Sequence, residues 1–411
     1  MAQELFLIYP FIMMSSAVLF MSIRLNRFQA NWALILQALF AIFMSDITTY
    51  LVHPGDYINY LSHLENCYSL EACFVFSPYE VGFTFISGVL GTILDTFGVE
   101  KIVRTMGRDV YTSHYLWVAL NSINVALMTI MCYLAGRIFK NQSISPAIQA
   151  LIFMYTFTSF LTVSLRSGLA LLIATIGLLS WIEKEDNLKR TKLGVYISIA
   201  LALSMHFQVI PFVVFILFTI NGGNYTNLVS GIDLFYWGTK GYFSKGVVIS
   251  TIALIIIFGF TFVFFEPIVN LLGKGYYKLD EKALGKGMGL RTIVDQVIIL
   301  LVIVPSFYKN KVIETNKKLK LFIEYFIIFN FVTVILSYLC TIILGIDGFA
   351  RQTQYNFIAF TVIFYATLYR SKLKNYRIFV PGGYALFASY YTLFNDTSFW
   401  FWNYKYIFNP V

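Results

Sequence analysis

Long apolar segments separated by short polar gaps run along the whole chain. A helix needs about 20 mostly apolar residues to cross the hydrocarbon core of a bilayer, and most of these segments come close to that length. Continuous apolar segments predict spanning helices, whereas the strands of an outer-membrane barrel alternate between apolar and polar residues. The segments fall at 5–23, 30–47, 80–97, 115–136, 146–164, 167–182, 193–205, 207–220, 246–265, 293–308, 320–344, 355–370 and 378–394.

We therefore expect an all-α polytopic integral membrane protein with about twelve transmembrane helices and one partial or re-entrant helix. No polar gap is long enough for a soluble domain, so residues 1–411 form a single transmembrane domain in this interpretation. The external loops 48–79 and 266–292 are expected to form part of its active-site cavity.

Composition supports this class. The chain is 58% hydrophobic and 12% charged, which excludes a water-soluble enzyme and a disordered scaffold. The net charge of +9 does not indicate nucleic-acid binding, because the basic residues lie in short gaps between apolar segments. Cytoplasmic loops of membrane proteins carry such an excess of Lys and Arg.

The basic gaps set the expected orientation. Gaps 183–192, 309–320 and 370–377 are rich in Lys and Arg, so we place them in the cytoplasm. The gap 48–79 has acidic residues and no Lys or Arg, and we place it outside. Alternation then requires that segment 80–97, which contains Gly82, Gly88 and Gly91 and is followed by Gly98, does not fully span, although the sequence leaves this open.

Two ionisable residues interrupt apolar segments at expected external turns. Arg166 and His206 are each costly at membrane depth and are therefore candidate functional residues. The alternatives are that Arg166 extends to the lipid headgroups and that His206 is a structural histidine bonded across helices.

The external loops contribute further candidates. Asp56, Asn59 and Tyr60 offer a carboxylate, an amide and a phenol, a mixture suited to sugars, although an interfacial tyrosine belt with a local turn would look the same. Glu80 follows Ser-Pro-Tyr, and its alternative role is to compensate the charge of a helix N-terminus.

Basic residues on the later external segments suit phosphate. Gap 266–292 combines glycines with lysines and ends at Arg291, a composition that also fits a solvated loop near anionic headgroups. Arg351 precedes the apolar segment that begins at Tyr355, and it could instead pair with Asp347.

The four cysteines are too few for a disulfide framework. Cys67 and Cys73 share the external loop 48–79, and the sequence leaves open whether they form a disulfide. Their spacing from His53 and His63 matches no zinc pattern, so no metal site is predicted.

An ordered set of short motifs resembles a known family. DYINY at 56–60, YEVGF at 79–83, LRSGLALLI at 165–173, MHF at 205–207 and ARQTQY at 350–355 resemble, in order and spacing, the EpsG-like branch of the Wzy-type polysaccharide polymerases. The resemblance implies a multi-pass protein of the bacterial inner membrane with its active site facing the periplasm. Such proteins join undecaprenyl-diphosphate-linked oligosaccharide units into O-antigen (lipopolysaccharide), capsule or exopolysaccharide chains.

With that resemblance we assign roles to the candidates. His206, Asp56 and Glu80 are candidate catalytic residues, with His206 favoured as general base. Arg166, Arg291 and Arg351 are candidates for binding the diphosphate, and Asn59, Tyr60 and Tyr355 for binding sugar.

The expected partners and cofactors follow from the same resemblance. The substrate is a lipid-linked oligosaccharide, the surroundings are membrane lipids, a chain-length regulator protein is a further candidate partner, and nucleic acid is not. No cofactor is expected, and the family resemblance implies independence from metal. The alternatives are a polyprenyl-linked-sugar-dependent glycosyltransferase or ligase and a transporter of lipid-linked oligosaccharide.

Overall fold

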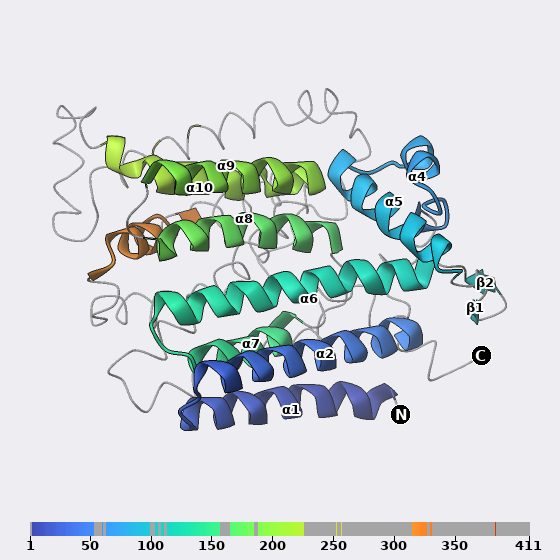
Figure 1. The fold of residues 1–411 in the computed structure, drawn as a ribbon, viewed down its shortest axis with the longest axis horizontal. Coiled ribbons are helices and arrows are strands. Elements are labelled where there is room, and N and C mark those ends of the chain that lie inside the picture. Colours follow the sequence, from blue (N-terminus) through green and yellow to red (C-terminus); the bar gives the residue numbers. More distant parts are fainter. Residues whose placement is uncertain are drawn as a thin grey trace, which may run out of the picture. The chain divides into compact units, whose positions relative to one another are not determined.

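The computed structural model describes most of the N-terminal half of the chain and a few short segments beyond it. The described residues are 2–52, 60, 63–98, 103–105, 108–110, 113–156, 165–184, 188–225, 252, 256, 315–326, 329–330 and 383. They are helical except for connecting turns and one short hairpin of strands (Figure 1).

The helices coincide with the predicted apolar segments. Those that match a predicted segment are α1 (Ala2–Ser22), α2 (Arg27–Val52), α5 (Val81–Thr96), α6 (Ser113–Ile138), α7 (Ile144–Thr156), α8 (Leu165–Glu183), α9 (Leu188–Met205) and α10 (Ile210–Tyr225). The short elements are α4 (Leu70–Phe76) and the 3-10 turn η1 (Phe207–Val209). Within the described residues, three segments are long and apolar enough to cross a membrane: Arg27–Asp46, His114–Ile138 and Leu165–Glu183. The predicted helical membrane-type fold is confirmed at this level.

Some boundaries differ from those predicted. Helix α9 begins at Leu188 rather than at 193, because the lysine and arginine that follow Leu188 are good helix formers and extend the helix into the polar gap. Residues 48–52 of the expected loop 48–79 belong to α2, and residues 70–76 form α4. Helix α5 has 16 residues and rises about 24 Å, short of the roughly 30 Å hydrocarbon layer.

Residues between α5 and α6 include a small sheet. Strands β1 (Val103–Thr105) and β2 (Arg108–Val110) pair antiparallel, with Val103 opposite Val110. The β-branched residues of this segment favour extended backbone.

The described helices fall into two compact units that divide between Val209 and Ile210. In the first unit α1, α2, α6, α7, α8 and α9 form a bundle in which α1 packs on α7, α6 lies between α2 and α8, and α8 packs on α9 (Figure 1). Helix α5 packs on α4, on α6 and on α9. In the second unit Phe215 of α10 stacks on Phe329, with ring centroids 4.8 Å apart.

Polar contacts between distant residues define the two ends of this bundle. At one end Leu25 N–H donates to Ser143 Oγ at 2.8 Å, and Arg137 forms an ion pair with Glu183 at 2.7 Å. At the other end His114 Nε2 lies 2.8 Å from Asp46 Oδ1.

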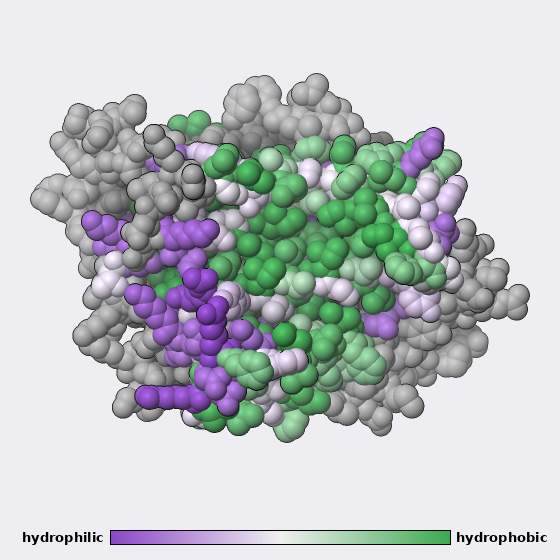
Figure 2. Space-filling model, viewed as in Figure 1, coloured by the Kyte–Doolittle hydropathy of each residue, from purple (hydrophilic) through white to green (hydrophobic). Residues whose placement is uncertain are grey.

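The two ends of the bundle differ in charge. We call the first the basic end, because its exposed charged residues are Arg24, Arg27, Arg137, Lys140 and Lys184. Figure 2 shows hydrophilic residues gathered on this side and a broad hydrophobic surface over the middle of the helices. A hydrophobic belt beyond a cationic end is the pattern expected of a helical bundle in a bilayer.

Close packing of α5 against the turn that precedes α4 depends on glycine. A Cβ atom at Gly91 would collide with the carbonyl oxygen of Cys67, whereas one at Gly194 of α9 would meet nothing within 4 Å. We expect Gly91→Ala to lower the free energy of unfolding by about 1–3 kcal/mol, the usual cost of overpacking. Gly194→Ala should leave it unchanged or raise it, since alanine favours helix. Thermal unfolding in detergent measures both, and equal midpoints for the two variants would contradict the assigned contact.

Candidate active site

Four polar side chains from separate parts of the chain meet at the end of the bundle opposite the basic end. They are Tyr60, Glu80 before α5, Arg166 in the first turn of α8, and His206 directly after α9. All four are sequence-predicted candidates, and Arg166 and His206 lie on the same side of the bundle, as expected.

Glu80 is the centre of this cluster. One carboxylate oxygen, Oε2, accepts a hydrogen bond from Arg166 Nη1 at 2.6 Å. The other, Oε1, lies 3.0 Å from His206 Nδ1. Only 3% of the Glu80 side chain is exposed, against 14% for Arg166 and 6% for His206. A single buried carboxylate therefore holds both basic side chains.

The local sequence explains why Glu80 sits where it does. Pro78 excludes helix from the residue before it, and the extended backbone of Glu80 makes it the N-cap residue of α5. The Ser77 hydroxyl lies 2.6 Å from that of Thr84 and accepts a hydrogen bond from the Tyr79 N–H at 3.1 Å. These bonds fix the turn that delivers the carboxylate.

The helical hairpin α8–α9 places the two basic partners. Arg166 is at the start of α8 and His206 follows the end of α9, so an antiparallel pair brings them to the same end. The His206 N–H still donates to Ala202 O at 3.1 Å, which continues the helical pattern by one residue. Gly82 lets α5 approach α9, because a Cβ there would overlap Ser204.

Aromatic rings enclose the Arg166 guanidinium. Its Cζ lies 4.0 Å above the centre of the Tyr79 ring, and its Nε donates to the Tyr60 hydroxyl at 2.9 Å. The Tyr60 ring in turn packs against Tyr79, Phe83 and Trp117, with centroid distances of 5.4, 5.7 and 5.5 Å. Cation–π contacts with desolvated rings stabilise a buried cation, so this setting keeps the guanidinium in place and charged.

The Tyr60 contacts bear on its predicted role. Tyr60 is 6% exposed, so its ring faces protein, and its hydroxyl is bonded to Arg166. Its sugar contact stays a prediction, whereas its contact with the arginine is observed.

The charges of the cluster agree with its geometry. Burial raises the pKa of Glu80, but the hydrogen bond and charge of His206 and the charge of Arg166 outweigh it and lower the pKa to about 2. Glu80 is therefore ionised at neutral pH. Arg166 uses Nε and Nη1 for its two hydrogen bonds, and its Nη2 makes none with the described residues.

The arrangement has clear chemical capacity. When the Nδ1–H of a histidine is held by a carboxylate, the other nitrogen of the neutral ring is an acceptor that can take a proton. The Glu80–His206 pair has this form. Beside it, Arg166 offers a positive charge to a group that becomes negative during a reaction.

Sequence reasoning missed two residues that support the cluster. Tyr79 carries the guanidinium on its ring face, and His63 packs edge-on against Tyr79 with centroids 4.6 Å apart. Tyr79 could have been found from its place next to Glu80. His63 could not, because its contacts depend on how the loop folds.

The loop containing His63 is closed by a disulfide between Cys67 and Cys73. His63 and the two sulfur atoms lie within 4.8 Å of one another, a grouping that could also suggest a metal. Because the sulfurs are bonded to each other, they cannot act as thiolate ligands. The described residues therefore give no support for a metal at this position.

The remaining predicted residues, Asp56, Asn59, Arg291, Arg351 and Tyr355, lie outside the described residues. So does loop 266–292.

No known family model, curated protein or solved structure matches this chain.

Mass spectrometry can test the disulfide directly. We expect a peptide pair linked through Cys67 and Cys73 in the non-reduced protein, and a gain of two free thiols on reduction. Cys132, which is free and buried in α6, serves as the internal control because its thiol signal is the same in both samples once unfolded. Free thiols at both positions in oxidised membranes would contradict the assignment.

The lowered pKa values of His63 and Glu80 predict two pH ranges in which the folded protein loses stability. Burial, followed by the charge of Arg166, lowers the pKa of His63 from 6.5 to about 4, so the unfolded chain takes up a proton first. Stability should fall as pH drops from 6.5 to 4. Glu80, with its pKa lowered from 4.5 to about 2, should cause a second loss as pH drops from 4.5 toward 2, on the order of 3 kcal/mol.

Two variants separate these pH ranges. His63→Phe keeps an aromatic ring against Tyr79 and should remove only the loss of stability between pH 6.5 and 4. Glu80→Gln should remove only the loss of stability below pH 4.5. Unfolding midpoints in detergent between about pH 7 and pH 3 measure both effects. Unchanged profiles in both variants would show that these groups do not carry the pH dependence.

Proposed function

We propose that this protein is a membrane glycosyltransferase that polymerises undecaprenyl-diphosphate-linked oligosaccharide repeat units into a surface polysaccharide. The observation that carries the proposal is the convergence of Arg166, Glu80 and His206 in one buried cluster. A diphosphate leaving group is already activated, so catalysis requires mainly a cation to hold it and a base to deprotonate the acceptor. The cluster supplies one of each.

The reaction proceeds in one transfer. The oxygen of an acceptor hydroxyl attacks the anomeric carbon of the donor, and its proton goes to His206 Nε2. The bond between that carbon and the diphosphate oxygen breaks, and undecaprenyl diphosphate leaves with the electron pair. Glu80 stabilises the imidazolium, and Arg166 binds the departing anion through Nη2.

The remaining candidates complete the site in this proposal. Arg291 and Arg351 bind the diphosphate together with Arg166. Asp56 is an additional acid–base candidate, and Asn59 and Tyr355 contact sugar. Tyr60 holds the Arg166 guanidinium through its hydroxyl and borders the sugar site.

The membrane setting follows the same proposal. About twelve helices span the bacterial inner membrane, with α5 as the partial one. The basic end faces the cytoplasm, since Lys and Arg are retained on that side. The cluster then faces the periplasm, an oxidising compartment in which the Cys67–Cys73 disulfide is stable. The product is an O-antigen, capsule or exopolysaccharide chain, and a chain-length regulator protein is a candidate partner.

Two other classes are less well supported. A transporter needs polar groups along a path to both faces, whereas Arg166, Glu80 and His206 gather at one end. A polyprenyl-linked-sugar glycosyltransferase of the metal-dependent type needs ligands for a metal, and in the group of possible ligands that the described residues bring together, at His63, both sulfurs are in the disulfide.

Single substitutions test the proposal in cells that make the polymer. We expect Arg166→Ala or His206→Ala to replace the ladder of long chains by single repeat units on a gel. The matched control is Arg137→Ala, which removes an arginine and its ion pair with Glu183 at the basic end and should leave the ladder intact. Ladders of normal length from both site variants, at normal protein levels, would refute the assignments.

The purified protein separates the three classes. We expect it to lengthen a diphosphate-linked oligosaccharide in detergent, where no transport is measurable, and to do so in the presence of EDTA. Loss of activity with EDTA would favour the metal-dependent transferase. Absence of any turnover would favour a carrier.

A further inference from the structure

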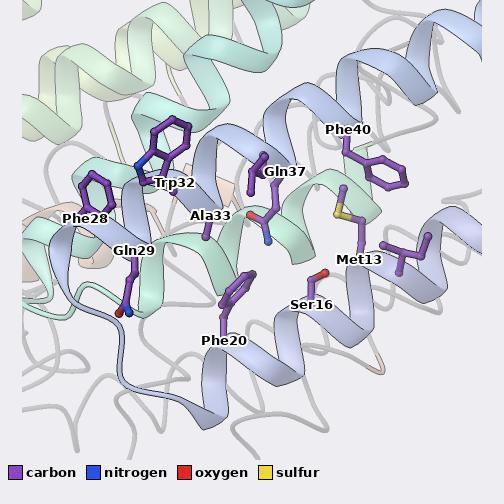
Figure 3. Close-up of a pocket in the computed structure, with 11 residues that line it drawn as sticks. Met13, Ser16, Phe20, Phe28, Gln29, Trp32, Ala33, Gln37 and Phe40 are labelled. Carbon is purple, nitrogen blue, oxygen red and sulfur yellow. The ribbon is translucent and has the colours of Figure 1, made fainter.

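A groove between α1 and α2 lies on the flank of the first unit. It encloses about 570 Å³ and is lined mainly by apolar and aromatic side chains, among them Phe20 of α1 and Phe28, Trp32 and Phe40 of α2 (Figure 3). Phe28 is 70% exposed and Trp32 is 50% exposed. The groove is therefore open along a surface suited to hydrocarbon.

One residue of the groove lacks the polar partner that its burial demands. Gln37 is 7% exposed, and neither its Nε2 nor its Oε1 has a hydrogen-bond partner among the described residues. Figure 3 shows its amide directed from α2 into the space between the two helices. An unpaired buried amide group costs about 1–3 kcal/mol, so this amide favours a ligand that brings a polar atom into the groove.

Two exposed arginines, Arg24 and Arg27, lie at the turn that joins α1 to α2, next in sequence to Phe28 and Gln29 of the groove lining. Arg24 makes no hydrogen bond or ion pair with the described residues, and Arg27 makes one, to the Tyr133 hydroxyl at 3.2 Å. No acidic residue lines the groove. An anion at the end of the groove nearest this turn would therefore meet two cations and no acidic residue of the groove lining.

We propose that this groove binds an anionic phospholipid of the bilayer. The phosphate lies at Arg24 and Arg27, an acyl chain follows the aromatic wall formed by Phe20, Trp32 and Phe40, and an ester oxygen accepts a hydrogen bond from the Gln37 amide. Gln37 is ten residues, about 15 Å, along α2 from Arg27, and helical side chains lean toward the helix N-terminus, which brings the amide back toward the headgroup.

A lipid fits these features better than a protein partner. A transmembrane helix would cover the aromatic wall but would bring no negative charge to Arg24 and Arg27. The groove is formed by α1 and α2, which supply none of the four residues of the cluster around Glu80, so this proposal does not depend on the catalytic one.

Quenching of Trp32 fluorescence measures occupancy of the groove. The full-length protein is titrated with phosphatidylglycerol or phosphatidylcholine whose acyl chains are brominated. The chain has six tryptophans, so the signal of Trp32 is obtained by subtracting that of Trp32→Phe. We expect Trp32 to be quenched at lower mole fractions of brominated phosphatidylglycerol than of brominated phosphatidylcholine.

Variants separate the contribution of the headgroup from that of the chain. Arg24→Ala and Arg27→Ala should each reduce the preference for phosphatidylglycerol by about fivefold, the effect of roughly 1 kcal/mol per basic residue at an anionic surface. Gln37→Leu should weaken binding of both lipids and keep the preference. Lys184→Ala removes an exposed lysine directly after α8 at the same end and should change neither.

Three outcomes would overturn the proposal. Equal quenching by the two lipids would show that the groove holds bulk lipid only. A preference that survives loss of both arginines would place the headgroup elsewhere. Absence of quenching at Trp32 by either lipid would show that protein covers the groove.

Discussion

The ionised Glu80 carboxylate is the interaction on which the described site depends. It is almost fully buried, and a buried carboxylate without partners would lose several kcal/mol of solvation. Arg166 and His206 each bond to one of its oxygens. Removal of any one of the three leaves the others with an unmatched polar group, so the three side chains are best understood as a unit.

This unit also ties together helices that are distant in sequence. Glu80 precedes α5, Arg166 lies in the first turn of α8 and His206 directly follows α9, and the close approach of Gly82 to Ser204 keeps α5 against α9. The loop closed by Cys67 and Cys73 supports the cluster with an aromatic contact. His63 of this loop packs on Tyr79, and Tyr79 packs on the Arg166 guanidinium. Stability and site geometry therefore depend on the same contacts.

The sequence predicted more of the site than of its surroundings. Arg166 and His206 could be found because charged or titratable groups in apolar segments are costly, and counting helix crossings placed them at the same end. Counting could not show that Glu80 bridges them, that Tyr60 bonds to the arginine, or that His63 supports Tyr79, because these contacts depend on the path of a loop. The early start of α9 was missed because Lys and Arg were counted as loop residues although they favour helix. The groove between α1 and α2 could not be predicted, because a single glutamine in an apolar helix does not indicate which side chains surround it.

Arg166 uses only two of its three nitrogens to bond Glu80 and Tyr60, which bears on how the cluster could support a reaction. A guanidinium has five N–H donors in a fixed plane, and Glu80 and Tyr60 occupy one on Nη1 and the one on Nε. An anion at Nη2 can therefore bind without displacing the carboxylate that orients His206. If Glu80 had occupied Nη2 as well, binding an anion would have broken the His206 dyad at the moment when a base is needed. Because the two anions use different nitrogens, the arginine can hold its structural partner and a ligand at the same time.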